Sequence, residues 1–399
     1  MSELLAPAGN LEKLETVYRF GADAAYIGLK NFSLRKRADN FFESEASRMT
    51  EIKGGRKLYG ALNIYFHNND LNALFENKEF LAACPLDGFI VSDPGIIEWL
   101  QTNFPNRQLH LSTQANCLNR EAAKFYHRLG FSRIVLGRET SLDEIKEIKD
   151  AVPDLELEVF VHGAMCLAYS GRCFLSRFMT QRSANSGDCA HSCRWEYRVL
   201  EEKERPGEFF PIETDERYTA VLSSKDLCLL HDLKTLQDAG IDSFKIEGRM
   251  KSIYYAAVVT RAYRKTLDAL AGADISDLAA YQQELEKVSH REFTRGFLFN
   301  DGDETKTTDR SYLRRYRLLG KVGEPTEDGR FALKLYNRLI AGEEIEWISP
   351  NFPYKKETGY FLSDEEGRPL ARAGHGQTVF ISSSHPIAPG DIIRKTEEA

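Results

Sequence analysis

Long apolar runs are missing from this sequence. None approaches the roughly 18 residues that a membrane-spanning helix requires. The first residues, MSELLAPAGN, also lack the basic start and long apolar stretch of a secretory signal. We therefore expect a cytoplasmic protein without a membrane span. The chain has 399 residues, 42% of them hydrophobic, which is enough for a large core in two domains or in one barrel with an appendage.

A surplus of basic residues is missing as well. The net charge is −7, so a nucleic acid would have to be held by a local basic patch. No G-x-G-x-x-G follows the first apolar run, which disfavours dinucleotide binding. Neither H-E-x-x-H nor G-x-S-x-G occurs, which disfavours metalloproteases and serine hydrolases.

A disulfide framework is not expected, because the cysteines number seven and no export signal precedes them. Four of them are clustered with the spacing Cys166-x6-Cys173-x15-Cys189-x3-Cys193. Four thiolates can hold a 4Fe–4S cluster, a 2Fe–2S cluster or tetrahedral zinc. Structural zinc usually uses closer pairs, so the spacing favours an iron–sulfur cluster, with zinc or unligated packed thiols as alternatives.

The three remaining cysteines stand apart from this group. Cys84 and Cys117 lie in apolar segments and are expected to be small buried side chains. Cys228 closely follows the segment SSKD and could approach the clustered cysteines.

Short β-like runs alternate with amphipathic helical patterns over about the first 270 residues. This alternation predicts parallel βαβ units, and eight runs favour closure into a TIM-like (β/α)₈ barrel over an open doubly wound sheet. Ser141 and Glu144 form a capping-box start for one helix, and a long helix is predicted over 253–270. The predicted strands are 3–6, 24–29, 58–65, 88–92, 109–113, 133–137, 155–162 and 243–247.

The seventh βα unit is abnormally long, because it carries the four clustered cysteines between His162 and a helix near Leu229. We therefore predict a barrel domain over 1–300 with a cysteine-rich loop at 163–197. Long βα loops of a barrel lie on its catalytic face. A polar linker at 301–311 and a small antiparallel β-barrel domain over 312–399 follow.

The cysteine region carries a family signature. The segment EVFVHGAMCLAYSGRCFLS fills every fixed position of the hallmark pattern of the collagenase-like peptidases of family U32, which the chain resembles from residue 1 to about 300. Its C-terminal part resembles the small domain of many members. Within the family, SLRKR, SCRWEY and FTRGF resemble the subgroup that hydroxylates tRNA. Other matching segments are ELLAPAGN, GADAAYIGL, SDPG, HLSTQAN, GDCAHSCRWEY, SSKDL and KIEGRMKS.

The resemblance implies an activity and its partners. Members of this subgroup make 5-hydroxyuridine at the wobble position of tRNA, without molecular oxygen and dependent on prephenate. Relatives hold 4Fe–4S clusters on cysteines, which implies such a cluster on Cys166, Cys173, Cys189 and Cys193. The expected partners are the anticodon region of tRNA, prephenate as cosubstrate and an electron donor.

Further site residues follow from this chemistry. A dicarboxylate needs guanidinium groups, for which Arg35, Arg37, Arg138 and Arg249 stand at strand ends, with Arg138 and Arg249 as the preferred pair. His162 and Glu247 are strand-end candidates, and His162 could act as a general acid or base. Glu158 would lie inside the barrel, paired with Lys245 or Arg138, as a catalytic or a structural group.

Two groups of basic and aromatic residues near the predicted domain hinge could bind RNA or could be solvated faces. They are Lys251, Tyr254, Arg261, Arg264 and Lys265, and Arg310, Arg314, Arg315, Tyr316 and Arg317.

Two other functions compete with RNA hydroxylation. One is a collagenase-like peptidase, which would need a free, reactive thiol. The other is a non-catalytic, zinc-stabilised scaffold that binds RNA or protein.

Overall fold

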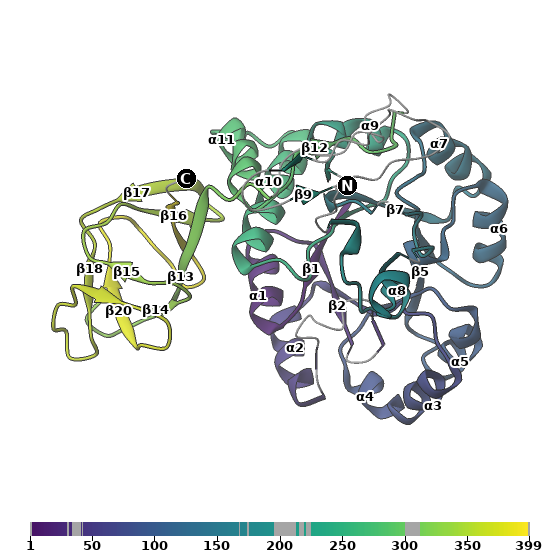
Figure 1. The fold of residues 1–399 in the computed structure, drawn as a ribbon, viewed down its shortest axis with the longest axis horizontal. Helices are drawn as coiled ribbons and strands as arrows, with labels where there is room; N and C mark the ends of the chain where they lie inside the picture. Colours follow the sequence, from purple (N-terminus) through teal and green to yellow (C-terminus); the bar gives the residue numbers. More distant parts are fainter. Residues whose placement is uncertain are drawn as a thin grey trace. The chain divides into compact units, whose positions relative to one another are not determined.

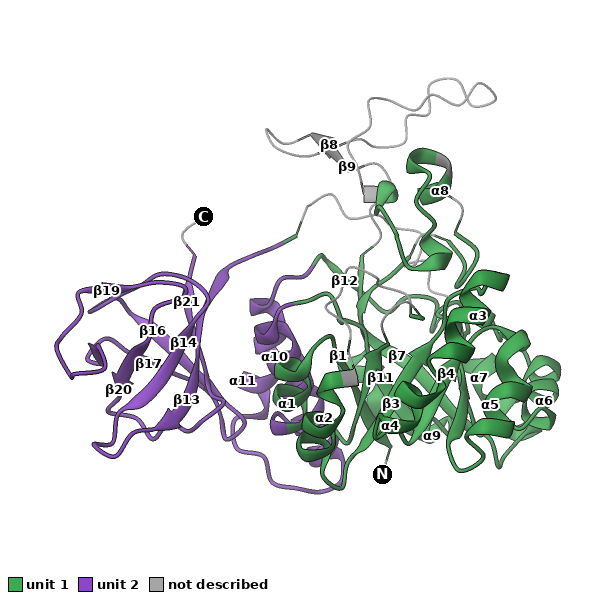
Figure 2. Cartoon of the chain, turned by 90° about the horizontal axis from the view of Figure 1, so that it is seen from below, with its two compact units in different colours: residues 1–18, 22–251, 291–312 green, residues 19–21, 252–290, 313–399 purple. Residues whose placement is uncertain are grey.

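A computed structural model describes residues 2–29, 32–33, 41, 43–166, 168–173, 175–194, 213–214, 219–220, 225–299 and 312–397. The chain forms two compact units (Figure 2). Unit 1 comprises Met1–Tyr18, Ala22–Lys251 and Arg291–Tyr312. Unit 2 comprises Arg19–Gly21, Ser252–His290 and Leu313–Ala399.

Unit 1 is built on a closed barrel of parallel strands (Figure 1). Neighbouring strands pair in sequence order from β1 to β7, and β11 pairs in parallel with both β7 and β1, which closes the ring. The closure confirms the predicted TIM-like barrel and excludes the open sheet. The barrel strands are β1 (Glu3–Ala8), β2 (Ala24–Gly28), β3 (Lys57–Leu62), β4 (Gly88–Val91), β5 (Gln108–Leu111), β6 (Arg133–Val135), β7 (Glu156–Ala164) and β11 (Ser243–Ile246).

Helices connect these strands, as the amphipathic patterns predicted. Ser141 caps α7 through the predicted capping box, in which its hydroxyl accepts from the Glu144 amide and Glu144 accepts from the Ser141 amide. The helices between barrel strands are α1 (Leu11–Arg19), α2 (Ala46–Lys53), α3 (Asn68–Glu76), α4 (Lys78–Ala83), α5 (Ile97–Asn103), α6 (Arg120–Arg128), α7 (Leu142–Ala151) and α9 (Leu233–Asp238).

Strand β7 carries an extension at its carboxyl end. Strand β10 (Asp226–Cys228) pairs with it antiparallel, and β12 (Phe293–Thr294) pairs in parallel with β10. The cysteine-bearing segment that follows β7 contains the short helix α8 (Leu175–Thr180). In Figure 2, α8 lies at the opposite end of the barrel from the N-terminus, where β1 begins. The segment therefore lies at the carboxyl ends of the strands, as predicted.

Unit 2 contains the long helix α10 (Ile253–Leu270), with the predicted bounds, and α11 (Leu278–Gln283). Its antiparallel strands confirm the predicted β-domain, whose sheet has the order β17-β16-β21-β13-β14-β20-β18 around a core that includes Trp347. The strands are β13 (Tyr316–Pro325), β14 (Phe331–Leu335), β16 (Ile345–Ser349), β17 (Phe352–Glu357), β18 (Phe361–Ser363), β20 (Val379–Ser382) and β21 (Ile392–Thr396), with the separate pair β15 (Leu339–Ile340) and β19 (Arg372–Ala373). Among all described helices, none is long and apolar enough to cross a membrane.

A buried charged network joins the helices of unit 2 to its sheet. The Arg394 guanidinium donates to Glu284 at 2.6 and 3.0 Å and to Glu346 at 2.6 and 2.8 Å. Its Nη1 also lies 2.5 Å from the Tyr254 hydroxyl. Tyr254 comes from α10 and Arg394 from β21, so this network couples the packing of α10 to that of the sheet.

Candidate functional site

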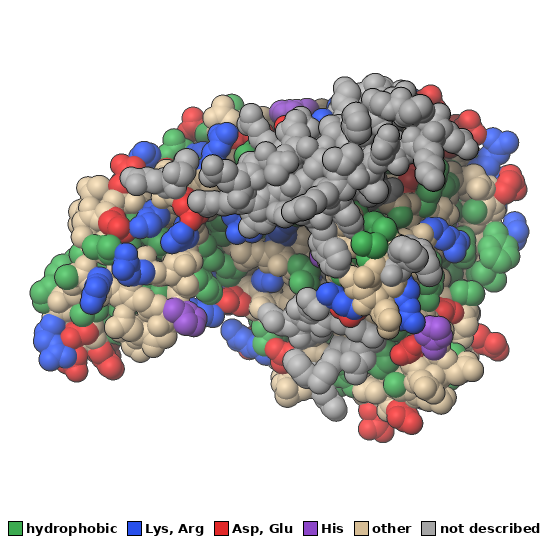
Figure 3. Space-filling model, viewed as in Figure 1, with side chains coloured by type: hydrophobic (Ala, Val, Ile, Leu, Met, Phe, Trp, Pro, Cys, Tyr) green, Lys and Arg blue, Asp and Glu red, His purple; other side chains and the backbone are tan. Residues whose placement is uncertain are grey.

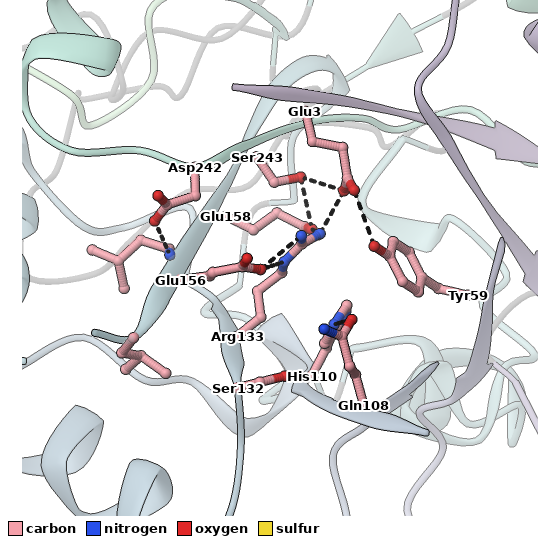
Figure 4. Close-up of polar contacts among 12 residues, drawn as sticks. Glu3, Tyr59, Gln108, His110, Ser132, Arg133, Glu156, Glu158, Asp242 and Ser243 are labelled. Atoms are coloured by element: carbon pink, nitrogen blue, oxygen red, sulfur yellow. Dashed lines mark hydrogen bonds and ion pairs between the residues drawn. The ribbon is translucent and has the colours of Figure 1, made fainter. Parts of the chain in front are cut away.

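The interior of the barrel holds a network of charged side chains (Figure 4). Glu158 is fully buried at its centre. Its carboxylate accepts hydrogen bonds from Lys245 Nζ at 2.8 Å, Ser243 Oγ at 3.0 Å and Arg133 Nη1 at 3.1 Å. Burial alone would raise the pKa of Glu158, but Lys245 and Arg133 together lower it to about 2. Glu158 is therefore a stable carboxylate rather than a proton donor at neutral pH.

Arg133 extends this network to the amino end of the barrel. Its guanidinium donates to Glu3 at 2.5 Å and to Glu156 at 2.8 Å, and Tyr59 donates to Glu3 at 3.0 Å. Glu3, Arg133 and Glu156 are the first residues of their strands. Because barrel enzymes carry out their chemistry at the carboxyl face, this position favours the structural interpretation of the Glu158 ion pair over the catalytic one.

The prediction that Lys245 pairs with Glu158 is confirmed, whereas the alternative prediction that Arg138 does so is wrong. Arg138 follows the end of β6, and its guanidinium lies 3.8 Å from the ring centre of Phe160. Parallel pairing instead sets Glu156 opposite Arg133 and Glu158 opposite Val135, which brings the Arg133 side chain to both carboxylates. Sequence reasoning missed Arg133 because it stands at the start of a strand, away from the catalytic face.

His110 is a second interior residue that sequence reasoning missed. Its ring packs edge-on against Tyr59 at 4.5 Å, and its Nδ1 is buried without a hydrogen bond to the described residues. Burial is the main reason why the pKa of His110 lies well below its usual value, and the charge of Arg133 lowers it further. The ring is therefore neutral. Its place in the segment HLSTQAN, within a predicted strand, was the available signal.

At the carboxyl face, His162 lies on β7 and Glu247 directly follows the adjoining strand β11. The Glu247 amide donates to the His162 carbonyl at 2.9 Å, and the Tyr26 hydroxyl lies 3.3 Å from Glu247 Oε2. The His162 side chain is buried, and its ring centre is 5.5 Å from that of Phe293. The structure thus brings these two predicted residues together, and their catalytic roles stay predictions.

The arginines predicted to bind a dicarboxylate are in different settings. Arg249 is buried and donates to Ser33 Oγ at 2.9 Å, while Arg138 is half-buried over Phe160. Arg35 and Arg37 lie outside the described residues. The preferred pair, Arg138 and Arg249, therefore stays a prediction.

Three barrel loops anchor the segment that carries the cysteines. After β6, Glu139 Oε1 accepts from the Ser170 amide at 2.8 Å. After β5, Asn116 Nδ2 donates to the Ser170 carbonyl at 3.3 Å. After β3, the Tyr65 hydroxyl lies 2.8 Å from the Gly171 carbonyl. The turn between Cys166 and Cys173 is thereby fixed to the carboxyl face.

Gly171 has to be a glycine in this arrangement. Its φ is +74°, and a Cβ there would lie 2.2 Å from the Gln114 carbonyl oxygen and 2.5 Å from the Tyr65 hydroxyl. Gly163 is similarly restricted, since its φ is +109° and a Cβ would lie 2.6 Å from the Glu247 carbonyl oxygen. The glycines of the signature therefore have a packing reason.

The four clustered cysteines are free thiols; Cys166 is exposed and the other three are half-buried. The Cys189 sulfur accepts from the His191 amide at 3.4 Å, and Asn185 and Arg182 donate to the carbonyls of Cys173 and Cys189. Among the described residues, no three His, Cys, Asp or Glu side chains converge as a ready-made metal site.

The chemistry of the donor set nevertheless fits an iron–sulfur cluster. Four reduced thiols lie on one short segment, and backbone amides such as that of His191 are available to sulfur. The second oxygen of Glu139, beside this segment, is buried and has no hydrogen-bond partner in the described ranges. Binding of a cluster would require the four side chains to converge further.

The remaining cysteines are accounted for separately. Cys84 and Cys117 are buried, as predicted, and burial raises the pKa of the Cys117 thiol to about 11. Cys228 lies on β10, opposite His162 in the antiparallel pairing. Its approach to the clustered cysteines stays a prediction.

The prediction that the basic and aromatic residues between 251 and 265 bind RNA is wrong for two of them. Arg261 and Tyr254 are buried in unit 2, where Arg261 donates to the Ser349 carbonyl at 2.6 Å and to the Phe352 carbonyl at 2.8 Å. They face the inside of the unit because α10 packs against its sheet. Arg310, in the other group, lies outside the described residues.

The chain belongs to Peptidase family U32. The family's profile matches residues 9–308, and that of the Peptidase family U32 C-terminal domain matches residues 314–394. The gap between the two matches, at residues 309–313, overlaps the end of the linker predicted at 301–311.

Two relatives are similar over nearly their whole length, and a third is similar over part of its length. A protein of Bacillus subtilis named tRNA hydroxylation protein P1 is 39% identical, over 98% of this chain and 94% of its own length. The Escherichia coli tRNA hydroxylation protein P is 34% identical, over 95% of this chain and 93% of its own. A 23S rRNA 5-hydroxycytidine synthase of Escherichia coli is 38% identical, over 67% of this chain and 39% of its own.

Proposed function

We propose that this chain hydroxylates uridine in tRNA, forming 5-hydroxyuridine at the wobble position. The observation that carries the proposal is the near full-length similarity to proteins named for tRNA hydroxylation. A relative named for hydroxylating a cytidine of ribosomal RNA supports the wider reaction class, since both products carry a hydroxyl on a pyrimidine. The reaction would take place in the cytoplasm, with tRNA.

We further propose that Cys166, Cys173, Cys189 and Cys193 hold a 4Fe–4S cluster. Converting C5–H of uridine to C5–OH is a two-electron oxidation that also adds an oxygen atom, and side chains that only transfer protons cannot accept the electrons. When bound, the cluster would supply electron transfer, and the two electrons and two protons that the base and water lose would go to a redox partner that acts as an electron acceptor, in place of the electron donor expected from the sequence. The reaction would not use molecular oxygen, so the oxygen atom would come from water or from the cosubstrate.

The protein's own side chains would bind and orient the substrates. Arg138 and Arg249 would hold the carboxylates of prephenate, because guanidinium groups bind carboxylates through paired hydrogen bonds. His162 and Glu247, joined through their backbones, would bind or move a proton at the base. Since a wobble base must leave its stack to be modified, it would enter from the carboxyl face.

A mass-spectrometric assay of tRNA nucleosides tests this function. The chain would be expressed in a bacterium that lacks its own hydroxylase, beside a Cys189→Ala/Cys193→Ala variant and a Cys84→Ala control. We expect 5-hydroxyuridine with the wild type and the control and none with the double variant. Accumulation of wild-type protein without hydroxylated uridine would contradict the proposal, and cleavage of gelatin by the purified protein would favour the peptidase instead.

A further inference from the structure

Tyr169 stands out on the surface of the cysteine segment. Among the large apolar and aromatic side chains that the structure describes, it is the most exposed, at 60%. It lies between Cys166 and Cys173, at the carboxyl face of the barrel. An exposed aromatic ring beside a candidate reaction centre offers a flat surface to a substrate with a π-face.

The backbone under Tyr169 is held in place. The Arg172 amide donates to the Tyr169 carbonyl at 3.0 Å, which closes a turn. The next residues of that turn are fixed because the Ser170 amide donates to Glu139 and the Gly171 carbonyl accepts from the Tyr65 hydroxyl. A fixed aromatic residue loses little backbone freedom when it binds, so its exposure can be used for recognition.

The segment around Tyr169 is basic in an otherwise acidic chain. Residues 166–194 contain four arginines and a single acidic residue, Asp188. Asp188 pairs with Arg182, at 2.9 Å. Arg172 is exposed and makes no ion pair within the described ranges. Figure 3 shows Lys and Arg side chains beside the part of this face where Figure 1 draws α8.

We propose that Tyr169 stacks on a base of single-stranded RNA and that Arg172 contacts an adjoining phosphate. This inference rests on the proposed function and names the contact by which the cysteine segment itself would hold the nucleotide. Stacking on an exposed aromatic ring beside a guanidinium is the pattern by which proteins bind unpaired nucleotides. The unpaired anticodon loop supplies such bases, whereas a base-paired stem does not.

The test is the affinity of the full chain for an anticodon stem-loop RNA, measured by fluorescence anisotropy at several salt concentrations. Removing the ring in Tyr169→Ala should weaken binding about tenfold, while Tyr169→Phe should stay within about twofold. Arg172→Ala should lower the slope of log Kd against log salt by about one. Phe125→Ala is the matched control, because Phe125 is 50% exposed on α6 and its loss should leave binding unchanged.

The outcomes separate this inference from the function on which it rests. Equal binding by the wild type and Tyr169→Ala would overturn the stacking role alone. Weaker binding by Phe125→Ala to the same extent would also overturn it, since the effect would not be specific to Tyr169. No binding by the wild type would overturn both proposals. Unchanged thermal unfolding of Tyr169→Ala would show that a loss of affinity does not come from a damaged fold.

Discussion

Glu158 keeps its charge inside the barrel because two cations are supplied by neighbouring strands. Replacing it in Glu158→Gln would leave Lys245 buried without its carboxylate partner. We expect this change to lower the free energy of unfolding by about 3–5 kcal/mol, as when one member of a buried pair is removed. Denaturation by urea at neutral pH measures the loss. Glu156→Gln is the control, since the Glu156 side chain is 43% exposed and its loss should cost less than about 1 kcal/mol.

The lowered pKa of Glu158 predicts that the stability of the fold depends on pH. The pKa of Glu158 is lowered to about 2 in the folded chain, whereas its ordinary value is 4.5. A lowered pKa stabilises the fold above the ordinary value, and this stabilisation is lost as the pH falls from 4.5 towards 2. Glu158→Gln should therefore lose less stability than the wild type over that window in parallel urea titrations. Identical pH profiles would contradict the assignment.

Gly171 gives a prediction about the cysteine segment. In Gly171→Ala the new Cβ would collide with the Gln114 carbonyl, and the turn between Cys166 and Cys173 would move off the barrel. We expect loss of bound iron and of 5-hydroxyuridine formation, with most of the barrel's stability retained. Gly55→Ala is the control, because a Cβ there meets open space without a positive φ. Normal iron and activity in Gly171→Ala would show that the anchoring is not needed.

For single residues, the features that could be predicted from the sequence are those that depend on local pattern. The spacing of the cysteines and the burial of Glu158 could be predicted, because they depend on motif and strand alternation. The pairing of Glu158 with Arg133 could not be, since it depends on the register of β6 against β7. His110 was missed for a related reason: only the closed barrel brings it against Tyr59.

At the scale of elements, the pairing of strands β10 and β12 depends on one ion pair, between Asp226 and Arg291. Asp226 accepts from Arg291 Nη2 at 2.6 Å and from the Arg291 amide at 3.1 Å. Burial alone would raise the pKa of Asp226, but Arg291 lowers it, so the pair is charged at neutral pH. We expect Asp226→Ala to speed hydrogen exchange of the Leu227 and Cys228 amides at least tenfold, corresponding to about 1.4 kcal/mol or more.

Asp232→Ala is the control for the hydrogen-exchange measurement on Asp226→Ala. It removes the partner of the partly exposed Arg295, so exchange in β10 should stay as in the wild type. Unchanged exchange in Asp226→Ala would contradict the role of the ion pair.

The barrel elements could be predicted because each strand has its own apolar run and each helix its own amphipathic pattern. The capping box of α7 and both ends of α10 were also visible in the sequence. Strand β10 was not predicted: it has three residues, and its antiparallel pairing with β7 depends on where the long insertion returns.

For the whole molecule, α10 groups with the C-terminal sheet rather than with unit 1. Arg394→Ala would leave Glu284 and Glu346 buried without their shared cation. We expect unit 2 to lose about 3–5 kcal/mol, measured by hydrogen exchange of its core amides in increasing urea. Arg317→Ala, which breaks an exposed pair with Glu397, should cost less than about 1 kcal/mol. Equal losses in both variants would contradict the importance of burial.

The proposed function depends on an iron–sulfur cluster that the four clustered cysteines hold and that is used to hydroxylate tRNA. The most direct measurement is the iron, acid-labile sulfide and zinc content of chain purified without oxygen, beside Cys189→Ala/Cys193→Ala. We predict about four irons and about four sulfides per chain in the wild type, both lost in the variant. Stoichiometric zinc without sulfide would contradict the redox chemistry and favour a structural scaffold.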